Sequence, residues 1–589
     1  MDIIRLSDDA FRRLAAGDNR PAVIGELADG QRSRRMVLLR ALLDAAGDPA
    51  TAGPLPSVAE TWVALEKIQA AAPAALDAVL LHPQVGSWLA YTLRRHRGGA
   101  SGRAPRHIDF GQLNTVALAA AALTGVPHRT VVPLRGGRVL VPRFGMATFE
   151  GCQAWDTAEA WTEDGRLRLR HGTATVDVPA EGDAPGWMAL RSLTVGEDDL
   201  SLTVFVDDID PWRDLADPVD PVRLTEDEFG TWAKLLQDAW TILVRHHRPV
   251  AEGLAAGFTS LAPLPAVTGW DTRSASTGDA FGAIMCSLPP DPVTLAVSLA
   301  HEFRHIALGG LMHLVALTEG PGEPCLYAPW RDDPRPAGGL LQGIYAFHGI
   351  AGFWRDQRRV PGNPHPRLDD FEYAYSRAQT REAIAIALAD GNLTERGRHF
   401  VRLMAAAMDD WDADSLDPEA AELARLVADG HRAGWRIRHR HPDPGTVKAL
   451  AAAWREQRTP PAERAPATVR PDPEMRHWSG ARLGLARRRL LAPEQYAQAG
   501  RASWGVALSD ADLDLFAGDA AAAAARFAAG LAADPRSEDA WTGLGLALQH
   551  AGASPAGDML LGHPDLVMAL HRELGGAADP AALAGWLAG

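Results

Sequence analysis

The chain has 589 residues, which is too long for one hydrophobic core, so we expect two to four domains. Its net charge of −15 argues against a general affinity for nucleic acid. The hydrophobic fraction of 47%, without a long apolar run, predicts a soluble protein with no membrane span. No secretory signal pattern begins the sequence, so we expect a cytoplasmic protein.

The changing hydrophobic period along the chain predicts an α+β fold that is mostly helical. The N-terminal part repeats with a helical period, a middle stretch repeats with a period of two, and the rest is again helical. The predicted segments are a helical N-terminal region at 1–128, a small antiparallel β region at 129–222, a helical core at 223–454, a linker at 455–475 and a helical tail at 476–589.

The predicted β region contains two hairpin signals, at Arg135-Gly136-Gly137 and at Glu163-Asp164-Gly165. The region ends in an acidic cluster at Asp207-Asp208-Ile209-Asp210. Such a cluster has the chemistry to coordinate a cation, but a solvated loop with local side-chain turns is the more common outcome, and we expect that outcome here.

The helical core opens with a capping box, in which Thr225 is the N-cap and Glu228 lies three residues later. A strand is predicted to end near Leu288. Asp291 is then the expected N-cap of the next helix, with Pro292 in its first turn. This second helix carries the motif that dominates the sequence.

That motif is His301-Glu302-Phe303-Arg304-His305, an H-E-x-x-H pattern within an apolar helix. Two histidines four residues apart share one helix face, so their imidazoles can bind one metal ion, with Glu302 beside a bound water or cosubstrate. A strand directly before such a helix is the arrangement of zincin-like metalloenzymes, in which a sheet edge can hold an extended peptide.

The third metal ligand is open on the sequence alone. His348, on the next predicted helix, has suitable chemistry, although a buried core histidine is an equally good interpretation. Gln342 on the same helix and a later carboxylate such as Glu372 are the other options. Between the two helices, Arg331 and Arg335 can make bidentate pairs with a dicarboxylate, or they can form salt bridges with Asp332 or Asp333.

The tail pattern is similar to a tetratricopeptide unit. An alanine-rich helix ends at Asp534-Pro535, and Trp541-Thr542-Gly543-Leu544-Gly545 follows as the start of another repeat. One or two repeats are too few for a free-standing solenoid, so we expect the tail to pack on the main body or to bind a partner.

Several motifs together resemble the actinobacterial HExxH family of peptide-modifying proteins, which occurs beside radical SAM maturases of ribosomal peptides. The resemblance extends over roughly residues 60 to 440. The motifs that carry it are A-F-G-A at 280–283, S-L-P-x-D-P at 287–292, H-E-F-x-H at 301–305, Y-A-P-W-R-D-D-P-R-P at 327–336 and G-L-L-Q-G-x-Y-A-F at 339–347.

The resemblance implies Fe(II)- and 2-oxoglutarate-dependent β-hydroxylation of a precursor peptide. For this activity we expect Fe(II) on His301 and His305, with His348 as the favoured third ligand and with Glu302 and Tyr345 as catalytic residues. Arg331, Arg335 and Gln342 are the implied cosubstrate contacts. Some relatives carry histidine at the position of Gln342, so the third ligand stays open.

Two other functions remain possible. One is a zinc metallopeptidase that cleaves a leader peptide, with Glu302 as general base. The other is a non-catalytic scaffold that binds a peptide and a radical SAM maturase. We expect no nucleic acid or membrane partner in any of the three cases.

Overall fold

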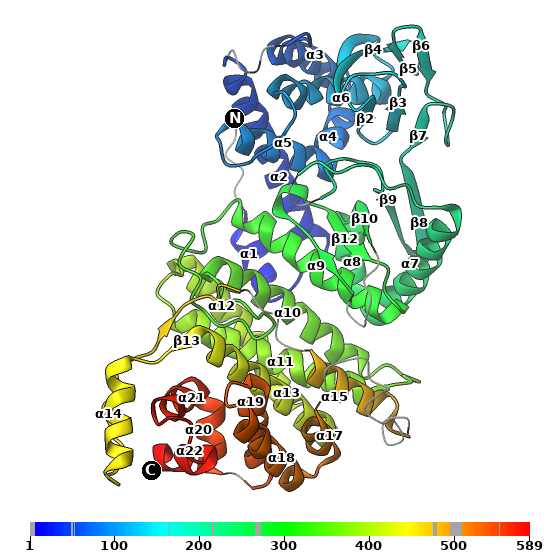
Figure 1. The fold of residues 1–589 in the computed structure, drawn as a ribbon. Coiled ribbons are helices and arrows are strands. Elements are labelled where there is room, and N and C mark those ends of the chain that lie inside the picture. Colours follow the sequence, from blue (N-terminus) through cyan, green and yellow to red (C-terminus); the bar gives the residue numbers. More distant parts are fainter. Residues whose placement is uncertain are drawn as a thin grey trace. The chain divides into compact units, whose positions relative to one another are not determined.

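The computed structural model describes residues 6–48, 51, 53–163, 165–214, 217–265, 272–474, 480–494, 509–552 and 554–589. The fold is mixed, with 57% helix and 13% strand, which confirms the mostly helical α+β class. The chain divides into two compact units, residues 1–315 and residues 316–589 (Figure 1). No helix in the described part of the chain is long and apolar enough to cross a membrane.

The first unit begins with six helices. They are α1 (Asp8–Ala15), α2 (Pro21–Ala45), α3 (Val58–Ala71), α4 (Pro73–Leu80), α5 (Pro83–His96) and α6 (Arg106–Thr124). Several begin at the signals that favour helix starts: Ser57 and Glu60 form a capping box before α3, and proline occupies the first turn of α2, α4 and α5. Helix α6 packs against the sheet that follows it and shares its hydrophobic core.

The first sheet has seven antiparallel strands in the order β6-β5-β4-β1-β2-β3-β7. The strands are β1 (His128–Arg135), β2 (Arg138–Val141), β3 (Gly145–Thr148), β4 (Trp155–Glu163), β5 (Arg166–His171), β6 (Ala174–Asp177) and β7 (Trp187–Ala189). The predicted turn at Gly136-Gly137 joins β1 to β2, and both glycines have positive φ, as a two-residue hairpin turn requires.

The second sheet has five strands in the order β11-β12-β10-β9-β8. They are β8 (Arg191–Glu197), β9 (Leu200–Val206), β10 (Ser260–Leu264), β11 (Ser274–Ala275) and β12 (Ala283–Ser287). Strand β10 pairs parallel with both β9 and β12, whereas β8 and β11 pair antiparallel with their neighbours. The stretch predicted as one β region therefore contributes strands to two sheets, and the second sheet continues beyond it.

Three helices pack on this second sheet (Figure 1): α7 (Glu226–His246) against β8, α8 (Arg248–Gly257) against β9, and α9 (Pro292–Met312) against β12. The predicted capping box begins α7, since Thr225 Oγ1 accepts from the Glu228 amide and the Glu228 carboxylate accepts from the Thr225 amide. Asp291 caps α9 through the Thr294 amide, and Pro292 lies in its first turn, both as predicted.

The second unit is helical apart from a short two-stranded sheet, β13 (Arg440–His441) with β14 (Thr468–Val469), in the part of the chain that the structure describes. Helices α10 (Ala337–Gln357) and α11 (Pro366–Ala389) pack side by side. The next helices are α12 (Glu395–Ala406), α13 (Pro418–His439), α14 (Pro444–Arg455) and α15 (Ala481–Leu491).

The last six named helices form the C-terminal part of the second unit: α17 (Asp510–Ala517), α18 (Ala520–Ala533), α19 (Glu538–His550), α20 (Pro555–Gly562), α21 (Pro564–Glu573) and α22 (Pro580–Ala588). They share one hydrophobic core with α13. Buried Arg482 on α15 joins this core because it donates to Asp512 Oδ1 and to Thr542 Oγ1, both at 2.8 Å.

Candidate metal centre

Helix α9 carries the H-E-x-x-H motif and has two different faces. Leu299, Phe303 and Ile306 are buried, whereas His301 and His305 are only partly buried. Glycines on α8 make room for the buried face: a Cβ at Gly257 would lie 3.0 Å from the Phe303 ring. This packing fixes the rotation of α9 about its axis, and therefore the direction of both histidines.

The two imidazoles converge as the sequence spacing predicts. The Nε2 atoms of His301 and His305 lie 3.2 Å apart, and the rings are nearly perpendicular. Two nitrogens that bind one ion at about 2.0–2.1 Å are separated by a similar distance, so this pair has the geometry of two ligands of one metal ion. Burial, with a contribution from His305, lowers the pKa of His301 to about 3, which keeps this imidazole in its neutral, ligating form.

Glu302 lies between the histidines in sequence but is held on the sheet side of α9. Its side chain is buried, and each carboxylate oxygen accepts a serine hydroxyl: Ser274 Oγ donates to Oε1 at 2.7 Å, and Ser276 Oγ donates to Oε2 at 2.6 Å. Oε1 also lies 3.8 Å from His301 Nε2. Strand β11 carries Ser274, which pairs with Cys286 on β12. The edge of the sheet therefore fixes the carboxylate beside the histidine pair.

In the first unit, the candidate centre consists of His301 and His305. Among its described residues, no further Cys, His, Asp or Glu joins His301 and His305 in a group of three ligand atoms within 4.8 Å of one another. The remaining predicted ligands, and the predicted cosubstrate contacts, belong to the second unit.

In the second unit, Arg331 and Arg335 converge on one carboxylate. Arg331 Nε donates to Asp333 Oδ1 at 2.9 Å, and Arg335 Nη1 donates to Asp333 Oδ2 at 3.0 Å. All three side chains are at least one-third exposed to solvent. Of the two predicted possibilities, the structure contains the salt bridges, and their partner is Asp333. Two guanidinium groups in this arrangement can bind one carboxylate between them.

Helix α10 carries three of the predicted residues. His348 is buried, with its ring 5.2 Å from that of Trp411, and Tyr345 is buried with its ring 5.7 Å from that of Phe400. Gln342 is half-buried. The alternative carboxylate, Glu372 on α11, accepts two hydrogen bonds from Arg487, at 2.6 and 3.2 Å. Glu372 is thus already engaged by a cation.

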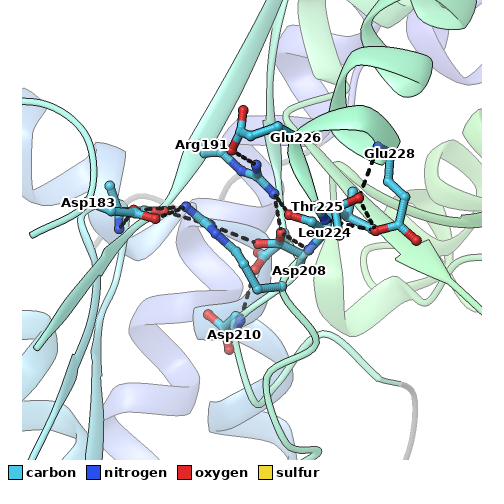
Figure 2. Close-up of polar contacts among 11 residues, drawn as sticks. Asp183, Arg191, Asp208, Asp210, Leu224, Thr225, Glu226 and Glu228 are labelled. Carbon is cyan, nitrogen blue, oxygen red and sulfur yellow. Dashed lines mark hydrogen bonds and ion pairs between the residues drawn. The ribbon is translucent and has the colours of Figure 1, made fainter.

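The prediction of a solvated loop at Asp207-Asp208-Ile209-Asp210 is wrong, because all four residues are at most 2% exposed. Asp208 is neutralised by two arginines (Figure 2): Arg191 Nη2 donates to Oδ2 at 2.7 Å, and Arg223 Nη1 donates to Oδ1 at 3.2 Å. The loop can be buried because the loop segment at Arg223 and the start of β8 at Arg191 supply these cations from 15 and 17 residues away in the sequence.

The structure also brings together titratable residues that no sequence pattern connects. His82 approaches Asp207 and Asp210 in one buried group, and Cys152, Asp156 and His171 form a second, half-buried group. Burial raises the pKa of Asp207 to about 7. Burial also raises the pKa of Asp210, with a further contribution from the Asp207 charge. The residues of each group are not spaced as in a known metal-binding motif, because they come from separate strands, loops and helix ends.

No protein-family model matches this sequence, and a search of curated proteins finds no significant match. The geometry of the residues is therefore the basis for any functional conclusion.

Proposed function

We propose that the chain is an Fe(II)- and 2-oxoglutarate-dependent enzyme that hydroxylates the β-carbon of a residue in a ribosomally made precursor peptide. The observation that carries the proposal is the 3.2 Å separation of the Nε2 atoms of His301 and His305. Both histidines lie on the partly exposed face of α9, and the opposite face of this helix is buried. Two imidazole ligands with open positions around the ion suit Fe(II). Bound Fe(II) and 2-oxoglutarate would supply the oxygen chemistry that hydroxylation of an unactivated carbon requires.

The contacts of Glu302 favour a positioning role over that of a general base. A general base in a hydrolase must accept a proton from a metal-bound water, which is easiest for a carboxylate free to approach that water. Here both oxygens of Glu302 already accept serine hydroxyls. We infer that Glu302 orients His301 or a ligand of the metal, and this favours the oxygenase over the zinc peptidase.

The arginine pair of the second unit supports the choice of a dicarboxylate cosubstrate. Arg331 and Arg335 hold the carboxylate of Asp333 from two sides, and 2-oxoglutarate presents the same group. In this proposal the cosubstrate replaces Asp333 as their partner. His348 as third ligand, Gln342 as a cosubstrate contact and Tyr345 as a catalytic residue stay predictions from the sequence.

Two finer features of the fold belong to the same proposal. A zincin-like core is supported by the edge strand β11, which runs antiparallel to β12 beside the metal-binding helix, and an extended peptide would pair with that edge. A tetratricopeptide-like tail is supported by close helix contacts: a Cβ at Gly543 would lie 2.3 Å from the Phe527 ring. We propose that the tail binds the maturase, and that the protein acts in the cytoplasm.

The deciding experiment uses the full chain, loaded with Fe(II) without oxygen, then mixed with 2-oxoglutarate and the peptide encoded beside it, and exposed to air. Mass spectrometry should find one added oxygen atom in the peptide, together with consumption of 2-oxoglutarate. Peptide fragments would instead establish the zinc peptidase. Peptide binding without any mass change would leave the scaffold as the remaining function.

Variants place the reaction at the histidine pair. His301→Ala and His305→Ala should each abolish hydroxylation and lower iron binding by about 100-fold or more, because each removes one of the metal ligands. Glu302→Ala should abolish hydroxylation while the chain retains iron. His246→Ala is the matched control, since His246 is an exposed histidine at the end of α7 in the same unit. Loss of iron in the Glu302 variant would contradict the positioning role.

A further inference from the structure

A second set of metal ligands lies in the first unit, among residues other than the H-E-x-x-H motif. His82, Asp207 and Asp210 each offer one ligand atom, and the three atoms lie within 4.8 Å of one another. Their exposed fractions are 2%, 0% and 2%. Two carboxylates and an imidazole that are removed from water in this way need a compensating partner, which is either a proton or a cation.

The imidazole of His82 identifies the kind of partner that is missing. Neither ring nitrogen has a hydrogen-bond partner among the described residues, although the ring is buried. Its Nε2 atom lies 3.7 Å from Asp207 Oδ2, and its ring packs edge-on against Phe205 of β9 at 5.6 Å. A buried imidazole normally satisfies both nitrogens. His82 therefore points a nitrogen lone pair or N–H at the carboxylates without forming a hydrogen bond to them.

The two carboxylates are fixed in place by the backbone. Asp207 Oδ1 accepts from the Asp210 amide at 3.2 Å, and Asp210 Oδ1 accepts from the Trp212 amide at 2.7 Å. The second oxygen of Asp207 has a long contact with the hydroxyl of Ser260, at 3.5 Å. Each side chain is thus held by one oxygen, which leaves the other oxygen for a ligand.

The nearby cations do not neutralise this pair directly. The guanidinium of Arg213 donates to the backbone carbonyls of Asp210 and Asp220, at 2.7 and 2.6 Å. In the described ranges no Lys or Arg pairs within 4.0 Å with the carboxylate of Asp207 or Asp210, whereas Asp208 is paired with Arg191 and Arg223. A divalent cation would balance the two carboxylates that lack such a pair.

A buried amide next to the site takes part in the same hydrogen-bond network through Ser260. Gln84 is 1% exposed, its Nε2 donates to Ser260 Oγ at 2.9 Å, and its Oε1 has no hydrogen-bond partner in the described structure. Gln84 lies two residues after His82, at the start of α5. The site has one imidazole nitrogen and two carboxylate oxygens, a mixture that suits zinc or manganese better than the all-oxygen preference of calcium and magnesium.

We propose that His82, Asp207 and Asp210 form a closed, structural site for a divalent transition metal of the zinc and manganese class. The ion joins the residue before α5 to the loop after β9, more than a hundred residues later in the chain. Because the ligands are fully buried, the metal enters during folding and exchanges slowly with the solvent. The site is separate from the His301 and His305 pair, and its existence does not depend on the proposed hydroxylase activity.

The test uses the full chain in a background that removes the other candidate ligands: His301→Ala, His305→Ala and Cys152→Ser. This protein is produced in medium with Zn²⁺, dialysed against a chelator while folded, and analysed for metal. We expect about one zinc ion per chain. Its X-ray absorption spectrum should contain one imidazole and oxygen donors, without sulfur. A metal-free chain, or a spectrum with sulfur or two imidazoles, would overturn the proposal.

Two isosteric variants locate the ion. Asp207→Asn and Asp210→Asn in the same background should reduce the retained zinc at least about 10-fold, whereas Asp208→Asn, in the same loop, should retain it. If the two carboxylates instead share a proton, both asparagine variants will match the background chain in thermal stability, with or without zinc. Should an asparagine variant fail to fold, the absorption spectrum of the background chain still decides the result.

Discussion

The indole of Trp330 occupies the space that Gly343 leaves on α10, and a Cβ at position 343 would lie 2.3 Å from Trp330 Cζ2. Trp330 also stacks on Phe347 of the same helix, with ring centroids 4.2 Å apart. The loop that carries Arg331 is therefore anchored to α10 by its preceding residue. The small residues of α10 therefore leave space for a loop tryptophan as well as for neighbouring helices.

Gly343→Ala should destabilise the second unit by about 1–3 kcal/mol, because the added methyl group displaces the indole. Thermal unfolding measures the loss, and the near-ultraviolet circular dichroism of tryptophan should change with it. Gly352→Ala on the same helix is the control. A Cβ there lies 3.7 Å from Trp411, an ordinary contact, so this variant should be neutral or slightly stabilising. Equal effects of the two variants would contradict the interpretation.

Ser276→Ala should lower the hydroxylation rate by about 10-fold while iron binding stays near that of the parent chain, because the hydroxyl only orients Glu302. Steady-state turnover and iron content provide the two readouts. Ser298→Ala is matched to it: Ser298 lies on α9 and donates to the Thr294 carbonyl. That variant should keep full turnover, and a similar loss in both variants would argue that α9 is simply disturbed.

If the two arginines bind 2-oxoglutarate as proposed, Asp333→Asn should lower the KM for 2-oxoglutarate by about 2- to 5-fold, because Asp333 would then compete for Arg331 and Arg335 in an exposed ion pair. Arg335→Lys should raise that KM, since lysine cannot make the bidentate contact. Asp332→Asn serves as the neighbouring control, as the Asp332 carboxylate lies 3.6 Å from His431. An unchanged KM in both the Asp333 and the Arg335 variants would remove these arginines from the cosubstrate site.

The stability of the second unit should depend on pH through Asp414. Burial alone would raise the pKa of Asp414, but hydrogen bonds from Arg355 and Tyr373 hold it at about 2. A pKa below the unfolded value of about 3.9 contributes stability above that value, and this stability is lost as the pH falls towards 2. Asp414→Asn should therefore cost about 1–2 kcal/mol at neutral pH, and less at pH 3.

Thermal unfolding at the two pH values measures the difference. Asp410→Asn is the control, because the Asp410 side chain is 73% exposed and its ion pair with Arg355 should contribute little. A cost for Asp414→Asn that is the same at both pH values would exclude this charge as its origin.

Local chemistry made part of this structure predictable. The Gly136-Gly137 turn, the Thr225 capping box and the Asp291 cap depend on residues within a few positions of one another, and all three form as predicted. The facing pair of His301 and His305 also follows from helix geometry alone. The α+β class follows from the change of hydrophobic period.

Long-range pairing was not predictable in the same way. The parallel partners of β10 come from strands on both sides of it in sequence, so no turn signal marks them. The burial of Asp207 and Asp210 likewise depends on elements that approach from elsewhere in the first unit. His82 precedes Pro83 at a helix start, and nothing in that local pattern indicates carboxylates more than a hundred residues away.

The position of Cys286 on β12 has a consequence for chemical reactivity. The thiol is fully buried, and burial, together with the charge of Glu302, raises its pKa to about 12. At neutral pH almost none of it is thiolate, the form that alkylating reagents attack. Iodoacetamide should therefore leave Cys286, on the strand that packs against α9, unmodified. The half-buried Cys152 and Cys325 are then the positions at which fluorescent or spin labels can be attached to the folded chain.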